Sequence, residues 1–129
     1  ILITHDIAVI AEMSDRIAIM YGGEIMEQAS AIDLFENPHH PYTLGLKNAF
    51  PSITTLGTEL ISIPGSPPTL VGPVQSCPSA PRCPYDDAIC HSANPEAKEI
   101  AEGHIVRCAH SADAARFREL AKEKSTWLS

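Results

Sequence analysis

The four cysteines of this 129-residue chain all lie in one short stretch of the sequence. They are Cys77, Cys83, Cys90 and Cys108, separated in turn by five, six and seventeen residues. Thiolates are soft ligands, and four of them suit a zinc ion or an iron–sulfur cluster. The spacing is neither the paired C-x-x-C of most structural zinc sites nor the tight run of a bacterial ferredoxin. The pattern therefore predicts one site with four thiols. It leaves open whether the site holds zinc or an iron–sulfur cluster, or whether the cysteines form disulfide bonds or remain free thiols.

Histidines and prolines surround the cysteines. His91, His104 and His110 could add nitrogen ligands, but four cysteines already make a complete set, so we expect surface or packing roles for these histidines. Seven of the eleven prolines fall between Pro64 and Pro84. Proline excludes regular helix and central strand there, and we expect loops to wrap the cysteines.

His5 is a second residue that could carry chemistry. It follows Ile1–Ile3, a short apolar run that predicts a strand buried on both faces. Functional groups of α/β sheets lie at the carboxyl ends of such strands, and an imidazole there can donate to a phosphate oxygen at neutral pH. A lone histidine in this position is more often structural. We assign Asp6 to capping the next helix rather than to acid catalysis.

Turn and capping residues divide the next part of the chain into short elements. Residues 16–21 predict a strand, Gly22-Gly23 a two-residue turn, and residues 24–28 the returning strand of a hairpin. Ser30 predicts the cap of a short helix, which Asn37-Pro38 ends.

Two further helices are expected. Pro41 opens one at its first-turn position, and Phe50-Pro51 ends it. We assign His39-His40 to the turn that precedes it. Residues 111–124 predict a terminal amphipathic helix with Ser111 as its cap. We expect four residues on its apolar face: Ala114, Phe117, Leu120 and Ala121.

Composition restricts the class of protein. The net charge of −7 argues against a nucleic-acid partner, and no apolar run is long enough to span a membrane. The chain has no signal peptide and no initiator methionine, so we expect it to begin inside a longer protein. Without a secretion signal the reducing cytosol is the default compartment, where clustered cysteines favour a metal over disulfide bonds.

Several segments together resemble one protein family. Residues 1–27, ILITHDIAVIAEMSDRIAIMYGGEIME, are similar to the end of an ABC-transporter ATPase domain. The segment NPHHPYTLGL at residues 37–46, the segment IPGSPP at Ile63–Pro68 and the cysteine spacing resemble the C-terminal extension of oligopeptide, dipeptide and nickel importer ATPases. The resemblance covers about residues 1–110.

This resemblance implies a role for each candidate site. His5 would contact the γ-phosphate of ATP, bound with Mg, and serve as the catalytic residue of a site shared with a second ATPase subunit. Some members hold a 4Fe-4S cluster at this cysteine pattern, which makes Cys77, Cys83, Cys90 and Cys108 its expected ligands. The implied partners are membrane permease subunits and, indirectly, a solute-binding protein, at the cytoplasmic face of the cell membrane. The same ATPase type serves peptides, nickel and other solutes, so the resemblance names no cargo.

The phosphate-binding, signature and Walker B motifs of such ATPases are missing from this sequence. We therefore expect a C-terminal portion that does not hydrolyse ATP alone, with an α+β fold. Residues 1–29 would end the P-loop ATPase domain, and residues 30–129 would form an extension with a loop-rich four-cysteine module and a terminal helix. Stripped of its sheet neighbours, the fragment is expected to self-associate through residues 1–30.

Two alternatives come from other classes of protein. The chain could be a metal-binding structural or interaction module, with iron–sulfur or zinc on the cysteines and no ATPase role. It could also be an extracellular domain stapled by disulfide bonds, which the absence of a secretion signal disfavours.

Overall fold

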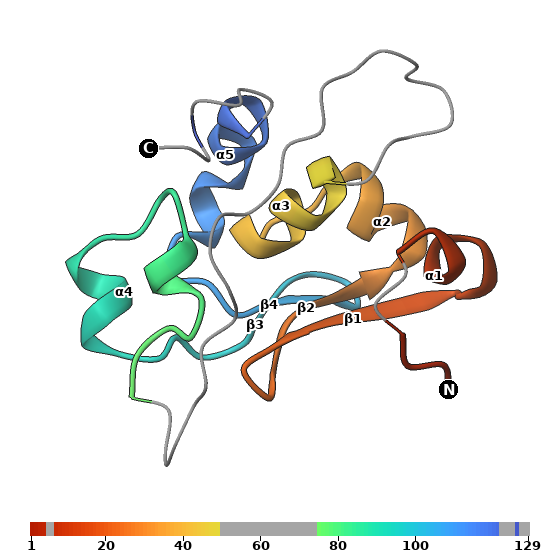
Figure 1. The fold of residues 1–129 in the computed structure, drawn as a ribbon, viewed down its shortest axis with the longest axis horizontal. Coiled ribbons are helices and arrows are strands. Elements are labelled where there is room, and N and C mark those ends of the chain that lie inside the picture. The colour runs from red at the N-terminus through yellow and green to blue at the C-terminus, as the bar shows by residue number, and fades with distance from the viewer. Residues whose placement is uncertain (5–6, 50–74, 122–125, 127–129) are drawn as a thin grey trace.

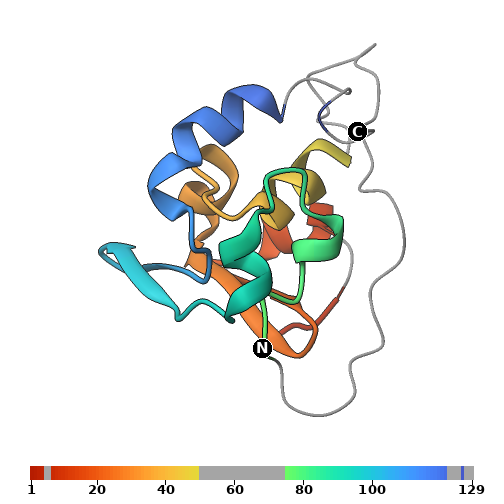
Figure 2. The same cartoon turned by 90° about the vertical axis from the view of Figure 1, so that its left-hand side faces the viewer.

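The computed structural model describes residues 1–4, 7–49, 75–121 and 126. Its strands form one antiparallel sheet, and helices α2 and α3 lie over one face of that sheet (Figure 1). The same layering is visible from the side (Figure 2). This is the small α+β arrangement expected from the sequence. The elements, in chain order, are α1 (Ile7–Met13), β1 (Arg16–Tyr21), β2 (Glu24–Ser30), α2 (Ala31–Glu36), α3 (Pro41–Ala49), η1 (Ala80–Arg82), α4 (Ala88–Ser92), β3 (Lys98–Ala101), β4 (His104–Val106), η2 (Ser111–Asp113) and α5 (Ala114–Leu120).

The first hairpin forms where the sequence predicts it. Strands β1 and β2 pair from Arg16 opposite Ser30 to Tyr21 opposite Glu24. Gly22 and Gly23 connect them with φ values of 60° and 82°. Two successive positive φ angles give the tight turn that matches the twist of the strands, and only glycine adopts them without strain.

The sheet contains two strands that the sequence analysis did not predict. Strands β3 and β4 form a hairpin within the cysteine-containing region, and β4 pairs with β2, giving the strand order β1-β2-β4-β3. The first hairpin has therefore gained a sheet neighbour, contrary to the expectation that it would have lost its partners. Both new strands are short, and every residue of β3 is exposed, so no alternation of apolar and polar residues marks it. Gly103, with a φ of 70°, was the one turn signal available.

The capping residues of α2 act as predicted. The Ser30 hydroxyl accepts the Asp33 amide at 3.2 Å, and α2 ends at Glu36, before Asn37-Pro38. Helix α3 begins at Pro41. Its predicted end at Phe50-Pro51 lies outside the described residues.

Side chains from the hairpin and the helices above it form the main core. Alternate residues of β1 are buried, and Ile17 and Ile19 pack with Ala29 of β2 and Leu34 of α2. Tyr21 extends this core toward α3, where its ring meets the Tyr42 ring edge to face with centroids 4.7 Å apart. The hairpin and the two helices therefore form one packed unit.

The terminal helix docks through Phe117. This side chain is 1% exposed, packs against Leu44 and stacks on Tyr85 with ring centroids 4.2 Å apart. Leu120, which we placed on the apolar face, is 41% exposed instead. The predicted Ser111 cap is also wrong: a 3-10 turn begins at Ser111, and no side chain caps either it or α5. None of the helices in the described part of the chain is both long and apolar enough to span a bilayer.

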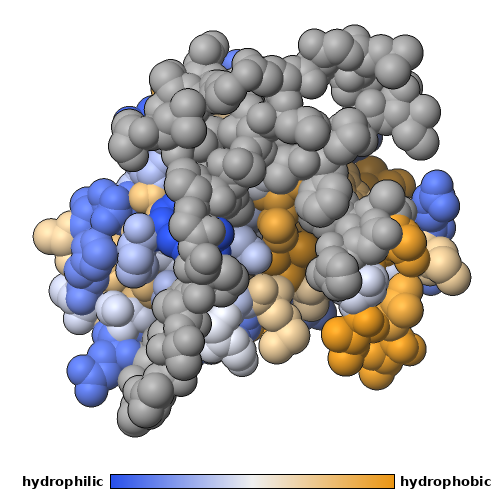
Figure 3. All heavy atoms as spheres, viewed as in Figure 1, coloured by the Kyte–Doolittle hydropathy of each residue, from blue (hydrophilic) through white to orange (hydrophobic). Residues whose placement is uncertain are grey.

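The expected strand at Ile1–Ile3 does not form. These three residues are irregular and exposed, at 125%, 49% and 92%. A strand is stable only when its backbone groups pair with a neighbour, and no described strand lies beside them. Figure 3 shows that hydrophobic side chains gather in part of this face of the molecule. Other exposed apolar residues are Val9 and Met13 of α1, Met20 of β1 and Ile32 of α2.

Candidate functional site

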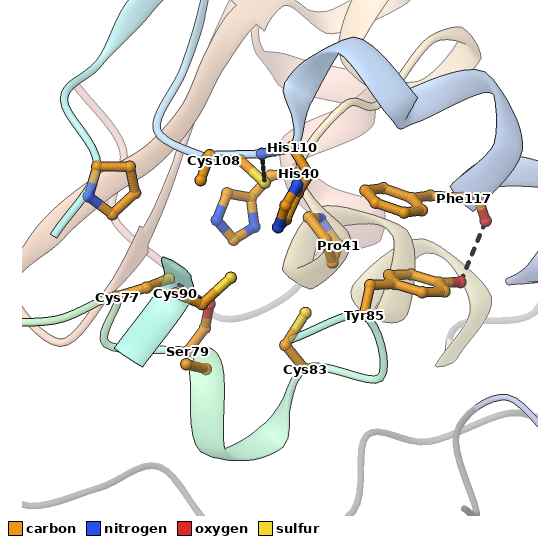
Figure 4. A pocket seen from close by; sticks show the side chains of 13 residues that line it. His40, Pro41, Cys77, Ser79, Cys83, Tyr85, Cys90, Cys108, His110 and Phe117 are labelled. Atoms are coloured by element: carbon orange, nitrogen blue, oxygen red, sulfur yellow. Dashed lines mark hydrogen bonds between the residues drawn. The ribbon is translucent and has the colours of Figure 1, made fainter. Parts of the chain in front are cut away.

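The structure brings the four cysteines to one pocket (Figure 4). Cys77 and Cys83 lie on either side of η1, Cys90 lies in α4, and Cys108 follows β4 by two residues. The pocket encloses about 340 Å³, part of it open to solvent. Its walls also include two histidines, two aromatic residues and two small residues: His40, His110, Tyr85, Phe117, Ser79 and Ala80.

Backbone hydrogen bonds hold the thiols in this arrangement. The Cys77 amide donates to the Cys90 carbonyl at 2.9 Å, and the Cys83 amide donates to the Ala80 carbonyl at 3.1 Å, which closes η1. The Asp87 carboxylate caps α4 by accepting two amides of its first turn, including that of Cys90 at 3.3 Å. These hydrogen bonds hold Cys83 and Cys90 in local turns and join the backbone of Cys77 to that of Cys90.

The protonation state of the thiols reflects their burial. Burial raises the pKa of Cys83 to about 12 and that of Cys108 to about 11, and it also raises the pKa of Cys90. Neighbouring cysteines, Cys77 among them, add to each shift because one thiolate disfavours another. The three thiols with raised pKa values are therefore protonated near neutral pH unless a cation compensates their charge.

The sulfur atoms are spread more widely than a single tetrahedral ion requires. A four-cysteine zinc site, with Zn–S bonds of roughly 2.3 Å, places its sulfurs about 3.8 Å apart. Among the described residues, the triads whose ligand atoms all lie within 4.8 Å are Glu27–His39–His104 and Asp87–Cys90–His110. Neither triad contains more than one cysteine, so no three of the four cysteine sulfurs all lie within 4.8 Å of one another.

Two of the histidines near the cysteines differ in their surroundings. His91 is exposed, and its Nε2 lies 2.6 Å from the Asp86 carboxylate, in keeping with the expected surface role. His110 lines the pocket, and its Nε2 lies 2.9 Å from the Asp87 carboxylate. This pairing lowers the pKa of Asp87. His110 therefore belongs to the wall of the site rather than to the outer surface.

Glu27 of β2 lies at the centre of a buried network that supports the pocket. Its side chain is fully buried, and its carboxylate accepts the amides of His39 at 2.8 Å and His40 at 2.9 Å. Nε2 of His104 lies 2.5 Å from the same carboxylate. Three donors from two distant segments thus satisfy one buried acid, and we assign this cluster a structural role.

His40 joins this network to the pocket. Its Nδ1 accepts the Tyr42 amide at 3.0 Å and its carbonyl accepts the Leu44 amide at 3.1 Å, so His40 is the N-cap of α3 with Pro41 in the first helical position. This is the helix-start role expected from the sequence. Burial lowers the pKa of His40 to about 4, opposed by the nearby Arg107 carbonyl. The imidazole is therefore neutral near pH 7.

Two sequence predictions fall on residues that the structure does not describe. His5, the predicted catalytic residue, lies outside the described residues, as does Ile63–Pro68. The structure therefore neither places the His5 side chain nor relates it to the four-cysteine pocket.

No pattern in the sequence marks Glu27 as an organising residue. In an alternating strand Glu27 shares a face with Ile25, which is exposed, so the pattern predicts a solvent-facing carboxylate. A signal was present in the turn: Pro38 and Pro41 enclose two residues whose amides need an acceptor from elsewhere. Only the tertiary fold shows that this acceptor is Glu27.

We predict that Glu27→Gln destabilises the protein by about 3–5 kcal/mol, the usual cost of removing one partner from a buried charged network. The glutamine side chain has only one oxygen acceptor, and its NH₂ group would face a donor that now bonds to a carboxylate oxygen of Glu27. Glu36→Gln is the matched control, because Glu36 is exposed on α2 and its replacement should change stability by less than about 0.5 kcal/mol. Chemical denaturation measures both, and equal stability of the two variants would contradict the assigned role of Glu27.

Comparisons with known proteins identify a family and several relatives of this chain. The family described as "Oligopeptide/dipeptide transporter, C-terminal region" matches residues 26–90, from β2 through the α3 turn to Cys90. The chain is 42% identical over 108 residues to the oligopeptide transport ATP-binding protein OppD of Salmonella typhimurium, covering 84% of this chain and 32% of that protein. It is equally similar over 108 residues to the dipeptide transport ATP-binding protein DppD of Bacillus subtilis, with the same coverage.

The oligopeptide transport ATP-binding protein OppD of Mycobacterium tuberculosis is also 42% identical, over 109 residues, which are 84% of this chain and 18% of that protein. The chain thus spans about a third, or less, of the length of the curated relatives that it matches. The family match extends over half of the chain. It includes Glu27, His39 and His40 of the buried network and three of the four cysteines, whereas His104 and Cys108 lie beyond it. The chain belongs to the family of oligopeptide/dipeptide transporter C-terminal regions.

Proposed function

We propose that this chain is part of the ATP-hydrolysing subunit that powers ABC import of oligopeptides or dipeptides. The observation that carries the proposal is the match of residues 26–90 to the C-terminal region of such transporters, joined to the matches with transport ATP-binding proteins. Residues 1–29 would be the end of the ATPase domain, and residues 30–129 the extension. The pairing of β2 with β4 is consistent with one shared sheet for the two parts.

The activity belongs to a longer subunit in this proposal. His5 would contact the γ-phosphate of ATP, bound with Mg, and orient the attacking water at a site completed by a second ATPase subunit. Closure of the two subunits would drive the membrane permease subunits at the cytoplasmic face of the membrane. A solute-binding protein would deliver the peptide, and this chain would make no direct contact with it.

Replacement of His5 tests the ATPase role in the longer protein that carries the phosphate-binding loop. His5→Ala should reduce steady-state ATP hydrolysis by about 100-fold or more, the scale expected when a group that positions the nucleophile is lost. His91→Ala is the control, because His91 is exposed and lies in the extension. If His5→Ala hydrolysed ATP at the rate of the His91→Ala control, His5 would have no catalytic role.

We further propose that the four cysteines hold a 4Fe-4S cluster. Four soft ligands from separate segments meet in one largely buried pocket, and their spacing favours a centre larger than one ion. When bound, such a cluster supplies one-electron chemistry and cross-links the loops that carry its ligands. In this chain Cys77, Cys83, Cys90 and Cys108 would each offer one thiolate, while the surrounding walls limit access of solvent.

Metal analysis of the protein purified without oxygen tests this second proposal. We expect about four irons and four acid-labile sulfides per chain, with visible absorption that Cys83→Ser abolishes. Ser92→Ala is the control, because Ser92 lies at the exposed end of α4. One zinc per chain, lost with the same cysteine replacement, would contradict the cluster and favour the alternative of a zinc-binding interaction module.

Self-association of the isolated chain is a third consequence of the proposal. In the longer subunit, the exposed apolar side chains of residues 1–3 and α1 would be covered by the rest of the ATPase domain. Without that domain we expect copies of the chain to associate through residues 1–30. Light scattering should show a mass that rises with concentration, and replacing Ile1 and Ile3 with Ser should reduce the rise. A monomer at every concentration would contradict this expectation.

A further inference from the structure

One buried donor in the four-cysteine pocket has no hydrogen-bond acceptor. The Nε2 atom of His40 is inaccessible to solvent and has no hydrogen-bond partner among the described residues. The ring itself is 1% exposed and lines the pocket together with all four cysteines. Buried polar groups are nearly always paired in folded proteins, so this orphan atom needs an explanation.

The position of the proton on His40 follows from the helix cap. Nδ1 accepts the Tyr42 amide at 3.0 Å, so its lone pair is used and it carries no hydrogen. A neutral imidazole then holds its one proton on Nε2, which makes that atom a donor. The Arg107 carbonyl is close enough to the ring to oppose the effect of burial on the pKa of His40, but no acceptor among the described residues meets Nε2 with the geometry of a full hydrogen bond. The Nε2–H group is therefore available to donate a hydrogen bond to a group bound in the pocket.

The surroundings of Nε2 indicate which acceptor it would meet. The sulfur atoms of Cys83, Cys90 and Cys108 are directed into the same space as the ring of His40 (Figure 4). The neighbouring walls, Tyr85 and Phe117, are aromatic, and the Tyr85 hydroxyl is already bonded to the Phe117 carbonyl at 3.2 Å. An anionic sulfur of a metal centre would thus be the strongest acceptor within the pocket.

We propose that His40 is a positioning residue of the four-cysteine centre and donates its Nε2–H to a sulfur atom of the bound iron–sulfur cluster or of a ligating thiolate. This inference rests on the proposed cluster. Hydrogen bonds to cluster sulfurs stabilise the more negative, reduced state, so they set the reduction potential. The segment that caps α3 would in this way also determine how readily the centre accepts an electron.

Two replacements of His40 separate the donor from the helix cap. Asn is a good N-cap and places an oxygen near the position of Nδ1, but its side chain is too short to reach the pocket as Nε2 does. Gln is longer and can place an amide N–H near the position of Nε2. His91→Asn is the control, since His91 is exposed and follows Cys90 without lining the pocket.

The experiment measures the reduction potential of the full chain, loaded with iron and sulfide without oxygen and titrated with dithionite. His40→Asn should keep the wild-type iron and sulfide content but reduce the equilibrium constant for one-electron reduction roughly tenfold, a shift of about 59 mV to more negative potential. His40→Gln should recover most of that shift, and His91→Asn should leave the potential unchanged.

Three outcomes would overturn the inference. An unchanged potential in His40→Asn at full cluster content would mean that His40 serves only as the helix cap. Loss of the cluster in both His40 variants would mean that His40 is needed to fold the pocket and not to donate a hydrogen bond to the centre. A wild-type chain without iron and sulfide would remove the proposed cluster itself, and this failure is recognised from the metal analysis before any potential is measured.

Discussion

The buried carboxylate of Glu27 is the interaction on which the rest of this structure depends. A charge inside a protein is tolerated only when hydrogen bonds replace its hydration, and Glu27 obtains them from His39, His40 and His104. The donors come from two segments far apart in the sequence, the turn before α3 and the start of β4. The carboxylate therefore fixes both segments to β2, and removing it would leave three buried or partly buried donors without an acceptor.

The position of the cysteine pocket follows from that constraint. Strand β4 leads directly to Cys108, and the Arg107 amide donates to the Met26 carbonyl at 2.8 Å, so β2 sets the place of this ligand. The turn held by Glu27 places His40 in the pocket wall and starts α3, on which α5 docks through Phe117. One buried network thus connects the sheet, the helix layer and the candidate metal centre. Its core lies within the segment that matches the transporter family.

Local rules predicted the parts of this fold that depend on local chemistry. Backbone conformation or capping restricts the residue type at three positions, so the sequence predicted the structure there. They are the Gly22-Gly23 turn, the Ser30 cap and the start of α3 at Pro41. The grouping of the cysteines in the sequence also indicated a single site. The β3–β4 hairpin was not predictable, because β3 is exposed and β4 has only three residues, so neither carries a clear pattern. The role of Glu27 was not predictable, because tertiary contacts specify a buried hydrogen-bond network. The strand predicted at Ile1–Ile3 does not form, because an apolar run becomes a strand only where a neighbouring strand can pair with it.

Amide hydrogen exchange at His39 and His40 tests the central role of Glu27 most directly. Both amides lie outside helices and strands, where exchange is usually fast, yet both donate to a buried carboxylate. If Glu27 has this role, the two amides exchange about as slowly as the amides that join β2 to β4, and only by cooperative opening of the sheet. Exchange of these two amides at the rate of an exposed turn, while the β2–β4 amides stay protected, would contradict it.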